Sequence, residues 1–312
     1  MAHLFTIATR GSPLALRQAE MLRARLAALT GADVAAFALR IVKTSGDRFL
    51  ADSLQDLGGK GLFTKEIDEA LLAGEADIAV HSAKDLPAEL PPGLVLAAFL
   101  PREDPRDALI SRNGACLADL AAGARIGTAS LRRRAQIRRL RPDLEPVLLR
   151  GNVGRRLAKC EAGEVDAVVL ALAGLRRLGL AERVSEILDP AAMLPAPAQG
   201  VIAIVARADD TKVRELLVRI DDPATRVTTS AERALAAGLD ASCRTPIAAL
   251  ANLRDGTLSL HARLISPDGG RMWEAVETGA GTVEEAAALG SRLAAELRTR
   301  AGAAFFAALA AR

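Results

Sequence analysis

Residues 4–29 read LFTIATRGSPLALRQAEMLRARLAAL. The apolar run at 4–9 predicts a strand, and the segment 13–29 predicts a helix with Ser12 as its N-cap. Pro13 fits the first helical position, because the N–H group that proline lacks has no partner there. A second apolar run at 34–43 predicts the next strand. The chain therefore opens with a β-α-β unit, which is typical of α/β folds.

The same alternation continues through the first two thirds of the chain. A polar, glycine-bearing stretch at 45–61 predicts a long loop that works as a lid. Beyond it the patterns predict helices at 63–72, 130–140 and 153–162, and strands at 78–81, 94–100, 108–111, 125–127, 146–150, 167–171 and 201–206. Such alternation favours parallel sheets.

From Pro223 onward the order of elements changes. A helix is predicted to about residue 239, followed by strands near 247–253, 258–265 and 272–277 and by one long C-terminal helix. That last helix begins with the capping box Thr282-x-x-Glu285, and Phe305 and Phe306 on it are expected to pack against the strands. The third part is therefore predicted to be a separate α+β domain.

Size and composition exclude several classes of protein. The chain has 312 residues, 50% hydrophobic and 25% charged, which indicates a globular protein of two or three domains. No uncharged apolar run, such as that at 167–175, approaches the roughly 20 residues that span a bilayer. No secretory signal is visible at the N-terminus, so we expect a cytoplasmic protein. The three cysteines (Cys116, Cys160, Cys243) and scattered histidines predict neither disulfides nor a metal site.

The charge balance indicates that any anion site is local. The net charge is only +3, which lacks the strong basic field of a general nucleic-acid binder. Only six of the 41 basic residues are lysine. High-GC coding could produce that skew, but arginine is also the residue whose planar fork grips a carboxylate or phosphate with two hydrogen bonds.

The positions of the arginines decide between coding bias and anion binding. Three predicted strand-to-helix junctions place arginine beside a helix N-terminus, where free N–H groups and the helix dipole already favour an anion. These junctions are Thr9-Arg-Gly-Ser-Pro13, Gly127-Thr-Ala-Ser-Leu-Arg-Arg133 and Arg150-Gly-Asn-Val-Gly-Arg-Arg156. A capped helix with a solvated arginine explains any one of them, whereas three in neighbouring α/β units predict a polyanionic ligand.

The arginine run at 132–141 has a second interpretation, as a nucleic-acid stripe. Its arginines point all round at helical spacing, and only 3% of the chain is aromatic, with no tyrosine. Base stacking is therefore poorly supported, and no nucleic-acid partner is predicted. Arg138, Arg139 and Arg141 are expected to form a solvated face.

Two further side chains are candidates for chemistry. Asp85 follows the short strand at 78–81, at the strand end where α/β proteins bind ligands, although it could instead pair with the adjacent Lys84. Cys243 is predicted to lie in a polar turn beside Arg244, which favours the reactive thiolate, whereas Cys116 and Cys160 lie in helix-like surroundings. Cys243 could also be an incidental loop cysteine. His81 by itself is more typical of a structural histidine.

Taken together, these segments resemble the porphobilinogen deaminase (hydroxymethylbilane synthase) family over essentially the whole chain. The matching motifs are Thr9-Arg-Gly-Ser-Pro-Leu-Ala-Leu16, Gly58-Gly-Lys-Gly-Leu-Phe63, His81-Ser-Ala-Lys-Asp-Leu-Pro87, Arg102-Glu-Asp-Pro-Arg-Asp107, Leu131-Arg-Arg133, Arg150-Gly-Asn-Val-Gly154 and the turn around Cys243. The resemblance implies a transferase of porphyrin and heme biosynthesis that joins four porphobilinogen molecules head to tail, releasing ammonia, and then frees the linear tetrapyrrole. It also implies a dipyrromethane cofactor held by a thioether.

The resemblance assigns roles to individual residues. Asp85 is the expected catalytic residue, which stabilises the cationic azafulvene left after ammonia departs. Cys243 is expected to carry the dipyrromethane covalently. The expected cofactor-binding residues are Lys84, Ser130, Arg132, Arg133 and Arg156, and the expected substrate-binding residues are Arg10, Ser12, Phe63, Arg150, Arg177 and Gln199.

The sequence departs from the family pattern at a few positions. Asp56 stands where some relatives have a basic residue, and Ala241-Ser242 and Ala248 stand where glycine is common. The segment before Gln199 and Gly200 is also changed. None of these departures removes a residue that is expected to be catalytic.

The expected architecture has two α/β lobes of the type II periplasmic-binding-protein kind and a small α+β domain that carries Cys243. The domains are expected at 1–99 with 200–220, at 100–199 and at 221–312, in a monomer. A non-catalytic two-lobed binding protein for a polycarboxylate stays open as the alternative, and Asp85 and Cys243 discriminate between the two. A transcription regulator would need a DNA-binding helix pair, which neither end of the sequence contains.

Overall fold

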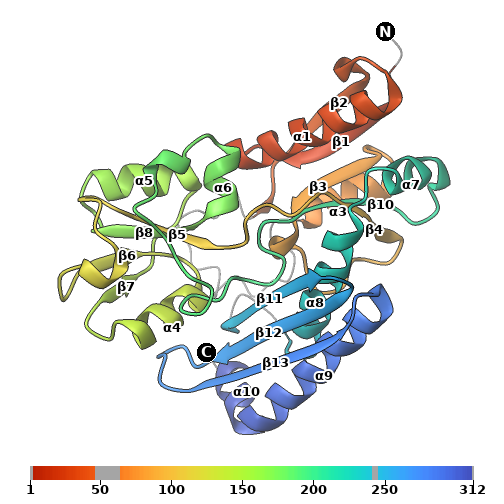
Figure 1. The fold of residues 1–312 in the computed structure, drawn as a ribbon. Coiled ribbons are helices and arrows are strands. Elements are labelled where there is room, and N and C mark those ends of the chain that lie inside the picture. The colour runs from red at the N-terminus through yellow and green to blue at the C-terminus, as the bar shows by residue number, and fades with distance from the viewer. Residues whose placement is uncertain (1–2, 46–63, 241–244, 311–312) are drawn as a thin grey trace. The chain divides into compact units, whose positions relative to one another are not determined.

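The computed structural model describes residues 3–45, 64–240 and 245–310. Contacts between residues divide the chain into two compact units (Figure 1). Unit 1 comprises Met1–Glu103 and Val201–Arg226, and unit 2 comprises Asp104–Gly200 and Val227–Arg312. Each unit is built on its own sheets.

Unit 1 contains one five-stranded sheet of order β2-β1-β3-β10-β4. Strand β1 is parallel to β2 and β3, whereas β10 is antiparallel to both β3 and β4. The strands are β1 (Phe5–Arg10), β2 (Phe37–Val42), β3 (Ile78–Ser82), β4 (Leu94–Phe99) and β10 (Ile202–Arg207). The helices are α1 (Pro13–Thr30), α3 (Lys65–Leu72), α7 (Thr211–Val218) and the 3-10 turns η1 (Val34–Ala36) and η2 (Ala83–Asp85).

The alternation of side chains along the strands decides which face each helix covers. Ile78 and Val80 of β3 lie in one apolar cluster with Leu22 of α1 and Val213 of α7. Their neighbour Ala79 therefore faces the opposite side, where α3 packs against β1 and β3. The sheet of unit 1 thus has helices on both faces, as α/β patterning predicts.

Unit 2 contains a second five-stranded sheet, of order β7-β6-β8-β5-β9. Strands β6, β7 and β8 are parallel to one another, whereas β5 is antiparallel to its neighbours β8 and β9. The strands are β5 (Asp107–Ser111), β6 (Arg125–Gly127), β7 (Glu145–Val147), β8 (Ala167–Ala171) and β9 (Glu186–Ile187). The helices are α4 (Leu131–Leu140), α5 (Val153–Glu161), α6 (Leu172–Arg177) and the 3-10 turns η3 (Leu117–Asp119) and η4 (Ala181–Arg183).

The expectation of parallel sheets was wrong, because two strand pairs in each five-stranded sheet are antiparallel. The pattern is the same in both sheets, although the antiparallel strand has a different origin in each: β10 returns to unit 1 after residues 104–200, and β5 is the first strand of its own sheet. This repeated order is the arrangement expected of the two lobes of a type II periplasmic binding protein, so the predicted fold class is confirmed.

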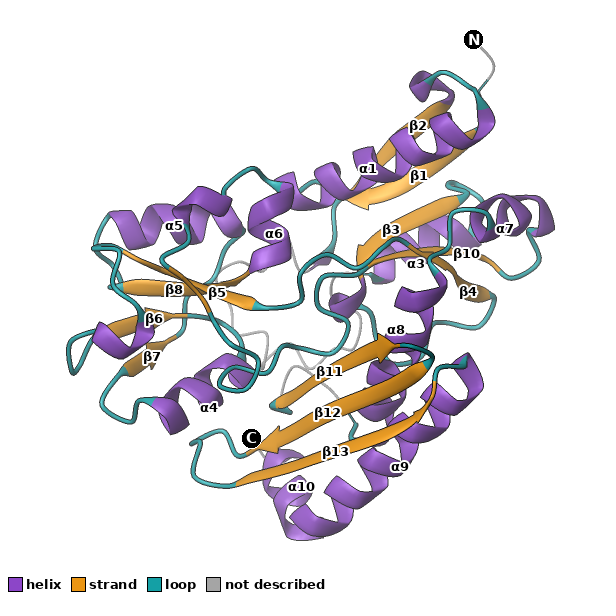
Figure 2. Ribbon diagram, in the orientation of Figure 1, coloured by secondary structure: helices purple, strands orange, loops and turns teal. Residues whose placement is uncertain are grey.

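The C-terminal part of unit 2 forms a separate layer with its own core (Figure 2). Its three antiparallel strands are β11 (Ile247–Arg254), β12 (Thr257–Ile265) and β13 (Met272–Ala280). The helices α8 (Pro223–Gly238), α9 (Val283–Ala301) and α10 (Ala303–Ala310) complete it. Thr282 Oγ1 accepts a hydrogen bond from Glu285 N at 3.2 Å, and Phe305 is buried against Trp273, as predicted. The C-terminal helix, however, is interrupted at Gly302, whose φ is +79°.

Several local predictions need correction. The short elements α6, α7 and β9 were not predicted, and residues 34–36 form a 3-10 turn before β2. Arg141 is not solvated, because it donates to the carbonyls of Leu117, Ala118 and Leu120, the last at 2.8 Å. Arg138 donates to Pro267 O at 2.9 Å, whereas Arg139 is exposed as expected.

The cysteines Cys116 and Cys160 lie in different surroundings, although both were expected in helices. Cys160 lies in α5, but Cys116 precedes a 3-10 turn instead of lying inside a helix. No helix in the described part of the chain combines the length and the hydropathy of a membrane-spanning segment.

Candidate active site

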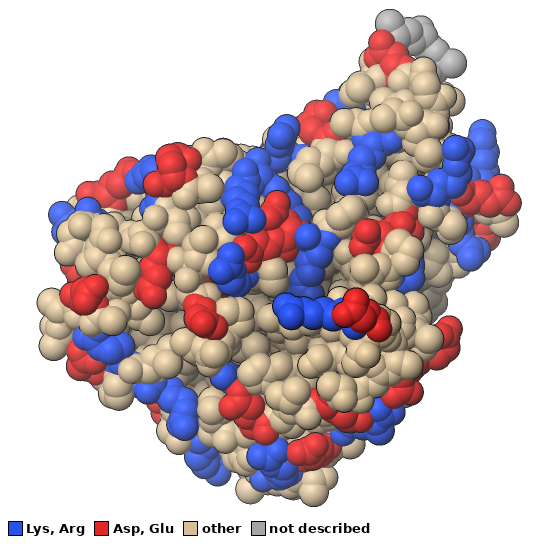
Figure 3. Space-filling model, in the orientation of Figure 1, with Lys and Arg blue, Asp and Glu red and all other residues tan. Residues whose placement is uncertain are grey.

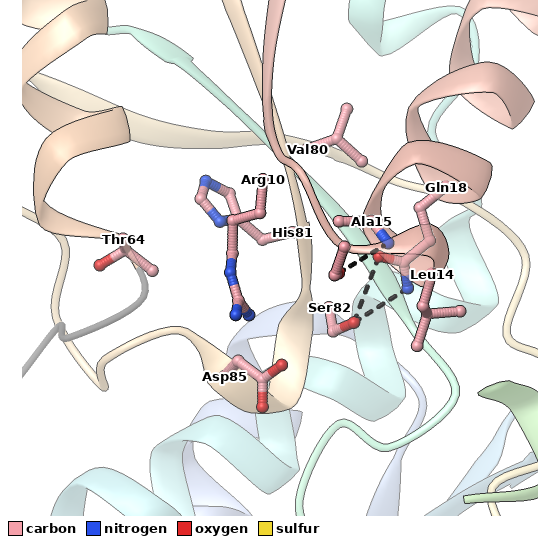
Figure 4. A pocket seen from close by; sticks show the side chains of 10 residues that line it. Arg10, Leu14, Ala15, Gln18, Thr64, Val80, His81, Ser82 and Asp85 are labelled. Carbon is pink, nitrogen blue, oxygen red and sulfur yellow. Dashed lines mark hydrogen bonds between the residues drawn. The ribbon is translucent and has the colours of Figure 1, made fainter. Parts of the chain in front are cut away.

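A pocket with a volume of about 70 Å³ opens in unit 1 at the carboxyl ends of β1 and β3 (Figure 4). The carboxyl ends of parallel strands are the usual ligand position in open α/β sheets. The lining residues are Arg10, Ser12, Leu14, Ala15, Gln18, Thr64, Val80, His81, Ser82 and Asp85. Three of the predicted site residues, Arg10, Ser12 and Asp85, are therefore brought together.

The first wall of the pocket is the junction between β1 and α1. Arg10 is the last residue of β1 and is half-buried. Ser12 caps α1, its Oγ accepting from Ala15 N at 3.3 Å. Gln18, one turn further along α1, donates from Nε2 to Ser82 Oγ at 2.9 Å, which joins this wall to the next.

The second wall is the end of β3 and the 3-10 turn η2. Asp85 is exposed in that turn and faces the pocket, and Figure 4 shows the Arg10 guanidinium pointing toward its carboxylate. Lys84 is also exposed in η2 but does not line the pocket. The pocket thus presents one carboxylate and one guanidinium beside polar groups of α1, which suits a ligand carrying both charges.

His81 lies in the same wall and was not assigned from the sequence. Its side chain is 5% exposed, and its Nε2 atom has no hydrogen-bond partner among the described residues. Burial, together with the charge of Arg10, lowers the pKa of His81 to about 4. The imidazole is therefore neutral at physiological pH.

Unit 2 carries two of the predicted arginine-rich helix N-termini. Helix α4 follows β6 with Ser130 as its N-cap, and α5 follows β7 with Asn152 as its N-cap. Since β6 and β7 are adjacent and parallel, both helices begin at the same edge of the sheet. Arg150 and Arg156 beside α5 are half-buried.

Arg132 and Arg133 of α4 have an internal partner that the sequence did not indicate. Both side chains are about 5% exposed and bind the fully buried carboxylate of Asp107. Arg132 Nη2 lies 2.8 Å from Asp107 Oδ2, and Arg133 Nη2 lies 2.7 Å from Oδ1. Gln199 Nε2 donates to the same Oδ1 at 2.8 Å.

The two arginines differ in how many of their donors are used. Arg133 donates from Nε and Nη2 to Asp107 and from Nη1 to Val169 O at 2.8 Å. Arg132 donates from Nη1 to Leu194 O at 2.7 Å, but its buried Nε has no hydrogen-bond partner in the described parts of the chain. Arg132 therefore has one buried donor without a partner in these parts of the chain, whereas the hydrogen bonds of Arg133 serve the fold.

The electrostatics of Asp107 follow from this arrangement. Burial by itself raises the pKa of the Asp107 carboxyl, but the Arg132 and Arg133 guanidinium groups and the hydrogen bonds from Arg133 and Gln199 outweigh it. The net result is a pKa well below the ordinary value. A clue was present in the sequence, since Asp107 begins an otherwise apolar strand.

The remaining predicted residues fall into two groups. Arg177, at the end of α6, donates from Nη2 to Gly200 O at 2.6 Å, and Gln199 is fully buried. Phe63, Cys243 and Asp56 lie outside the described residues. On the face seen in Figure 3, lysine and arginine side chains are interspersed with acidic ones.

Comparison with known proteins identifies the family of this chain. The family model described as "Porphobilinogen deaminase, dipyromethane cofactor binding domain" matches residues 5–215, and "Porphobilinogen deaminase, C-terminal domain" matches 226–299. Proteins named porphobilinogen deaminase from Nitrobacter winogradskyi and Nitrobacter hamburgensis are each 52% identical over 303 residues, covering 97% of this chain and 95% of theirs.

A solved structure, the Bordetella pertussis BvgS periplasmic VFT2 domain, aligns with a TM-score of 0.39 and 19% identity over 68% of this chain and 84% of that one. The two family models, in contrast, together match most of this chain, and the alignments with the two curated relatives cover 95% of their length. The chain belongs to the porphobilinogen deaminase family.

Proposed function

We propose that the pocket of unit 1 is the place where this chain condenses porphobilinogen, and that Asp85 is its catalytic residue. The chain is a transferase that joins four porphobilinogen molecules head to tail, with loss of ammonia, to give hydroxymethylbilane. The observation that carries the assignment of Asp85 is its position in one pocket with Arg10 and Ser12. A purely binding role for the chain is not favoured by its family.

The substrate explains the two charges of the pocket. Porphobilinogen carries an acetate, a propionate and an aminomethyl group. Arg10 offers a planar pair of donors to one of the carboxylates, and the Ser12 end of α1 adds the positive end of a helix dipole. Asp85 then faces the carbon from which ammonia leaves, where a fixed negative charge stabilises the developing cation more than it stabilises the substrate.

The residues of unit 2 fit the dipyrromethane cofactor of the family. The cofactor is rich in carboxylates, and the N-termini of α4 and α5 present donors at one sheet edge. The buried Nε of Arg132, without a hydrogen-bond partner among the described residues, is a donor of the kind such a carboxylate needs. When bound, the cofactor supplies the pyrrole carbon to which the first substrate is joined.

The other residues of unit 2 take different parts. Arg150 and Arg156 bind carboxylates beside α5, and Ser130 orients α4 by capping it. Arg133 holds Asp107 and thereby fixes the backbone of α4. Arg177 and Gln199 act by positioning the 199–200 segment, since Arg177 donates to Gly200 O and Gln199 donates to Asp107.

The assignment of Asp85 is tested by Asp85→Asn. The amide keeps the shape of the side chain and removes its charge, so we expect ammonia release to slow by a factor of about 100 to 1,000. The melting temperature is expected to stay unchanged, because Asp85 is exposed. Glu89→Gln, an exposed acid of unit 1 outside the pocket, is the matched control. Normal turnover by Asp85→Asn refutes the catalytic role.

The attachment of the cofactor is tested by intact mass. We propose that Cys243 carries the dipyrromethane through a thioether, so the purified chain is expected to exceed its sequence mass by two linked pyrroles. Peptide mapping is expected to place the excess on Cys243 and on neither Cys116 nor Cys160. The Cys160 thiol is buried, and burial raises its pKa. A raised pKa disfavours the thiolate, which is the form that makes a thioether bond. An active chain of unmodified mass refutes the attachment.

The proposal also includes the domain boundaries, the oligomeric state, the location and the absence of a nucleic-acid partner. Unit 2 holds two domains, because its five-stranded and three-stranded sheets have separate apolar clusters. Limited proteolysis is expected to cut near residues 99, 200 and 220. The chain is proposed to act as a cytoplasmic monomer without a nucleic-acid partner, which sedimentation and cell fractionation would check.

A further inference from the structure

His81 lies on the face of the unit 1 sheet that α3 covers. Its neighbours in β3, Ile78 and Val80, belong to the apolar cluster on the α1 face. Because side chains alternate along a strand, His81 projects to the other face. Its side chain is only 5% exposed there, so the ring is packed and has little freedom to move.

The register of the sheet places Arg10 beside His81. Strands β1 and β3 pair in parallel with Ile7 opposite Ile78 and Ala8 opposite Ala79. Two residues further along, Arg10 is level with His81 and on the same face. Both residues line the pocket, and Figure 4 shows the Arg10 side chain beside the His81 ring with its guanidinium pointing toward Asp85.

The other neighbour of His81 offers no polar group. Strand β10 places Ala203 opposite His81, and the methyl group of Ala203 is fully buried. The Nε2 atom of His81 is enclosed and has no hydrogen-bond partner in the described part of the chain. The His81 ring can therefore affect its neighbours only through packing and charge. In the strand register, the charged neighbour is Arg10.

A neutral ring at this position has a clear physical consequence. A protonated imidazole would repel the guanidinium of Arg10 and push it out of the pocket. Burial and the nearby Arg10 charge both keep His81 unprotonated. A small side chain at position 81 would instead leave space into which the Arg10 stem could fall.

We infer that His81 is a positioning residue for Arg10: the buried, uncharged ring beside the Arg10 stem holds the guanidinium over the pocket, where it binds a carboxylate of porphobilinogen. This inference rests on the proposed function of the pocket. His81 itself touches no reacting atom in it. Its effect is therefore expected to be on substrate binding and to vanish when Arg10 is absent.

A double-mutant cycle tests this dependence. The variants are His81→Asn, Arg10→Gln and the double variant, each assayed for the kcat and KM of porphobilinogen consumption, with the melting temperature measured in parallel. His81→Asn is expected to raise KM about tenfold with kcat changed less than twofold. In the Arg10→Gln background the same substitution is expected to change KM by less than twofold.

A control separates positioning from general stability. Ile204→Val shortens a fully buried side chain of β10 on the α1 face of the same sheet, so it lowers the melting temperature without touching Arg10. Its KM is expected to equal that of the unmodified chain. If His81→Asn does not fold, His81→Gln, which keeps more of the ring's volume, carries the same cycle.

The outcomes are distinct. An equal rise of KM in both backgrounds, or no rise in either, overturns the positioning role while leaving the proposed function intact. An unmodified chain that consumes no porphobilinogen overturns the proposed function and this inference with it.

Discussion

Asp107→Asn is expected to cause a large loss of stability in unit 2. The amide keeps the size of the side chain but removes the negative charge that neutralises Arg132 and Arg133. All three side chains are about 5% exposed or less. The variant therefore leaves two guanidinium groups buried without the carboxylate that they both bind.

The magnitude follows from the burial of the pair. Removing one partner of a buried ion pair costs about 3–5 kcal/mol, because the remaining charge stays desolvated. For a cooperative unit of this size, each kcal/mol lowers the melting temperature by roughly 2–4 °C, so a fall of roughly 6–20 °C is expected for unit 2. Asp143→Asn is the control, since it removes the charge of an exposed carboxylate that pairs with Arg141 and is expected to have a much smaller effect.

The assay is thermal unfolding followed by circular dichroism at several pH values. Because the folded state holds the pKa of Asp107 far below the unfolded value near 3.9, the stabilisation is fully present above about pH 4. It is lost only as the pH falls through the folded pKa. The gap between the unmodified chain and Asp107→Asn should therefore be constant from pH 7 to about pH 4 and narrow below it. A shift no larger than that of Asp143→Asn refutes the reasoning.

Three further perturbations have defined outcomes. Arg150→Ala is expected to slow chain elongation about tenfold with little change in melting temperature, and mass spectrometry of trapped intermediates would show accumulation of short chains; an unchanged distribution contradicts carboxylate binding there. Burial raises the pKa of Asp68 to about 6, so this carboxyl destabilises the fold increasingly as the pH rises from its unfolded pKa of about 3.9 to about 6, and Asp68→Asn should melt higher at pH 8 but not at pH 4. In Gly290→Ala the new Cβ would lie 2.2 Å from Ala231 O, so urea unfolding should show a loss of about 1–3 kcal/mol, and an unchanged midpoint would mean that α8 and α9 do not pack closely.

Local signals in the sequence predicted most helices and strands and all three arginine-bearing helix N-termini. Ser12, Ser130 and Thr282 cap their helices through hydrogen bonds to backbone groups three residues away. Such contacts depend only on nearby residues, so the sequence contains them. The same holds for Asp85, whose place at the end of β3 follows from the apolar run before it.

The directions of β5 and β10 could be determined only from the tertiary structure. The buried runs of β5 and β10 look the same whichever way a strand runs, because both faces of each strand are covered. Only the pairing of β10 with β3 and of β5 with β8 shows that these strands are antiparallel to their neighbours. The pattern of helices between strands therefore predicted layers correctly and strand directions only in part.

The partners of the buried charged residues were likewise decided by the tertiary structure. Arg132, Arg133 and Gln199 meet at Asp107 although 26 and 92 residues separate Asp107 from Arg133 and Gln199. A charged residue must find a counter-charge when it is buried, but its sequence neighbours do not say which one. The sequence by itself thus determined where arginines gather at helix N-termini, while the tertiary structure determined that Arg132 and Arg133 of α4 pair with Asp107 of β5.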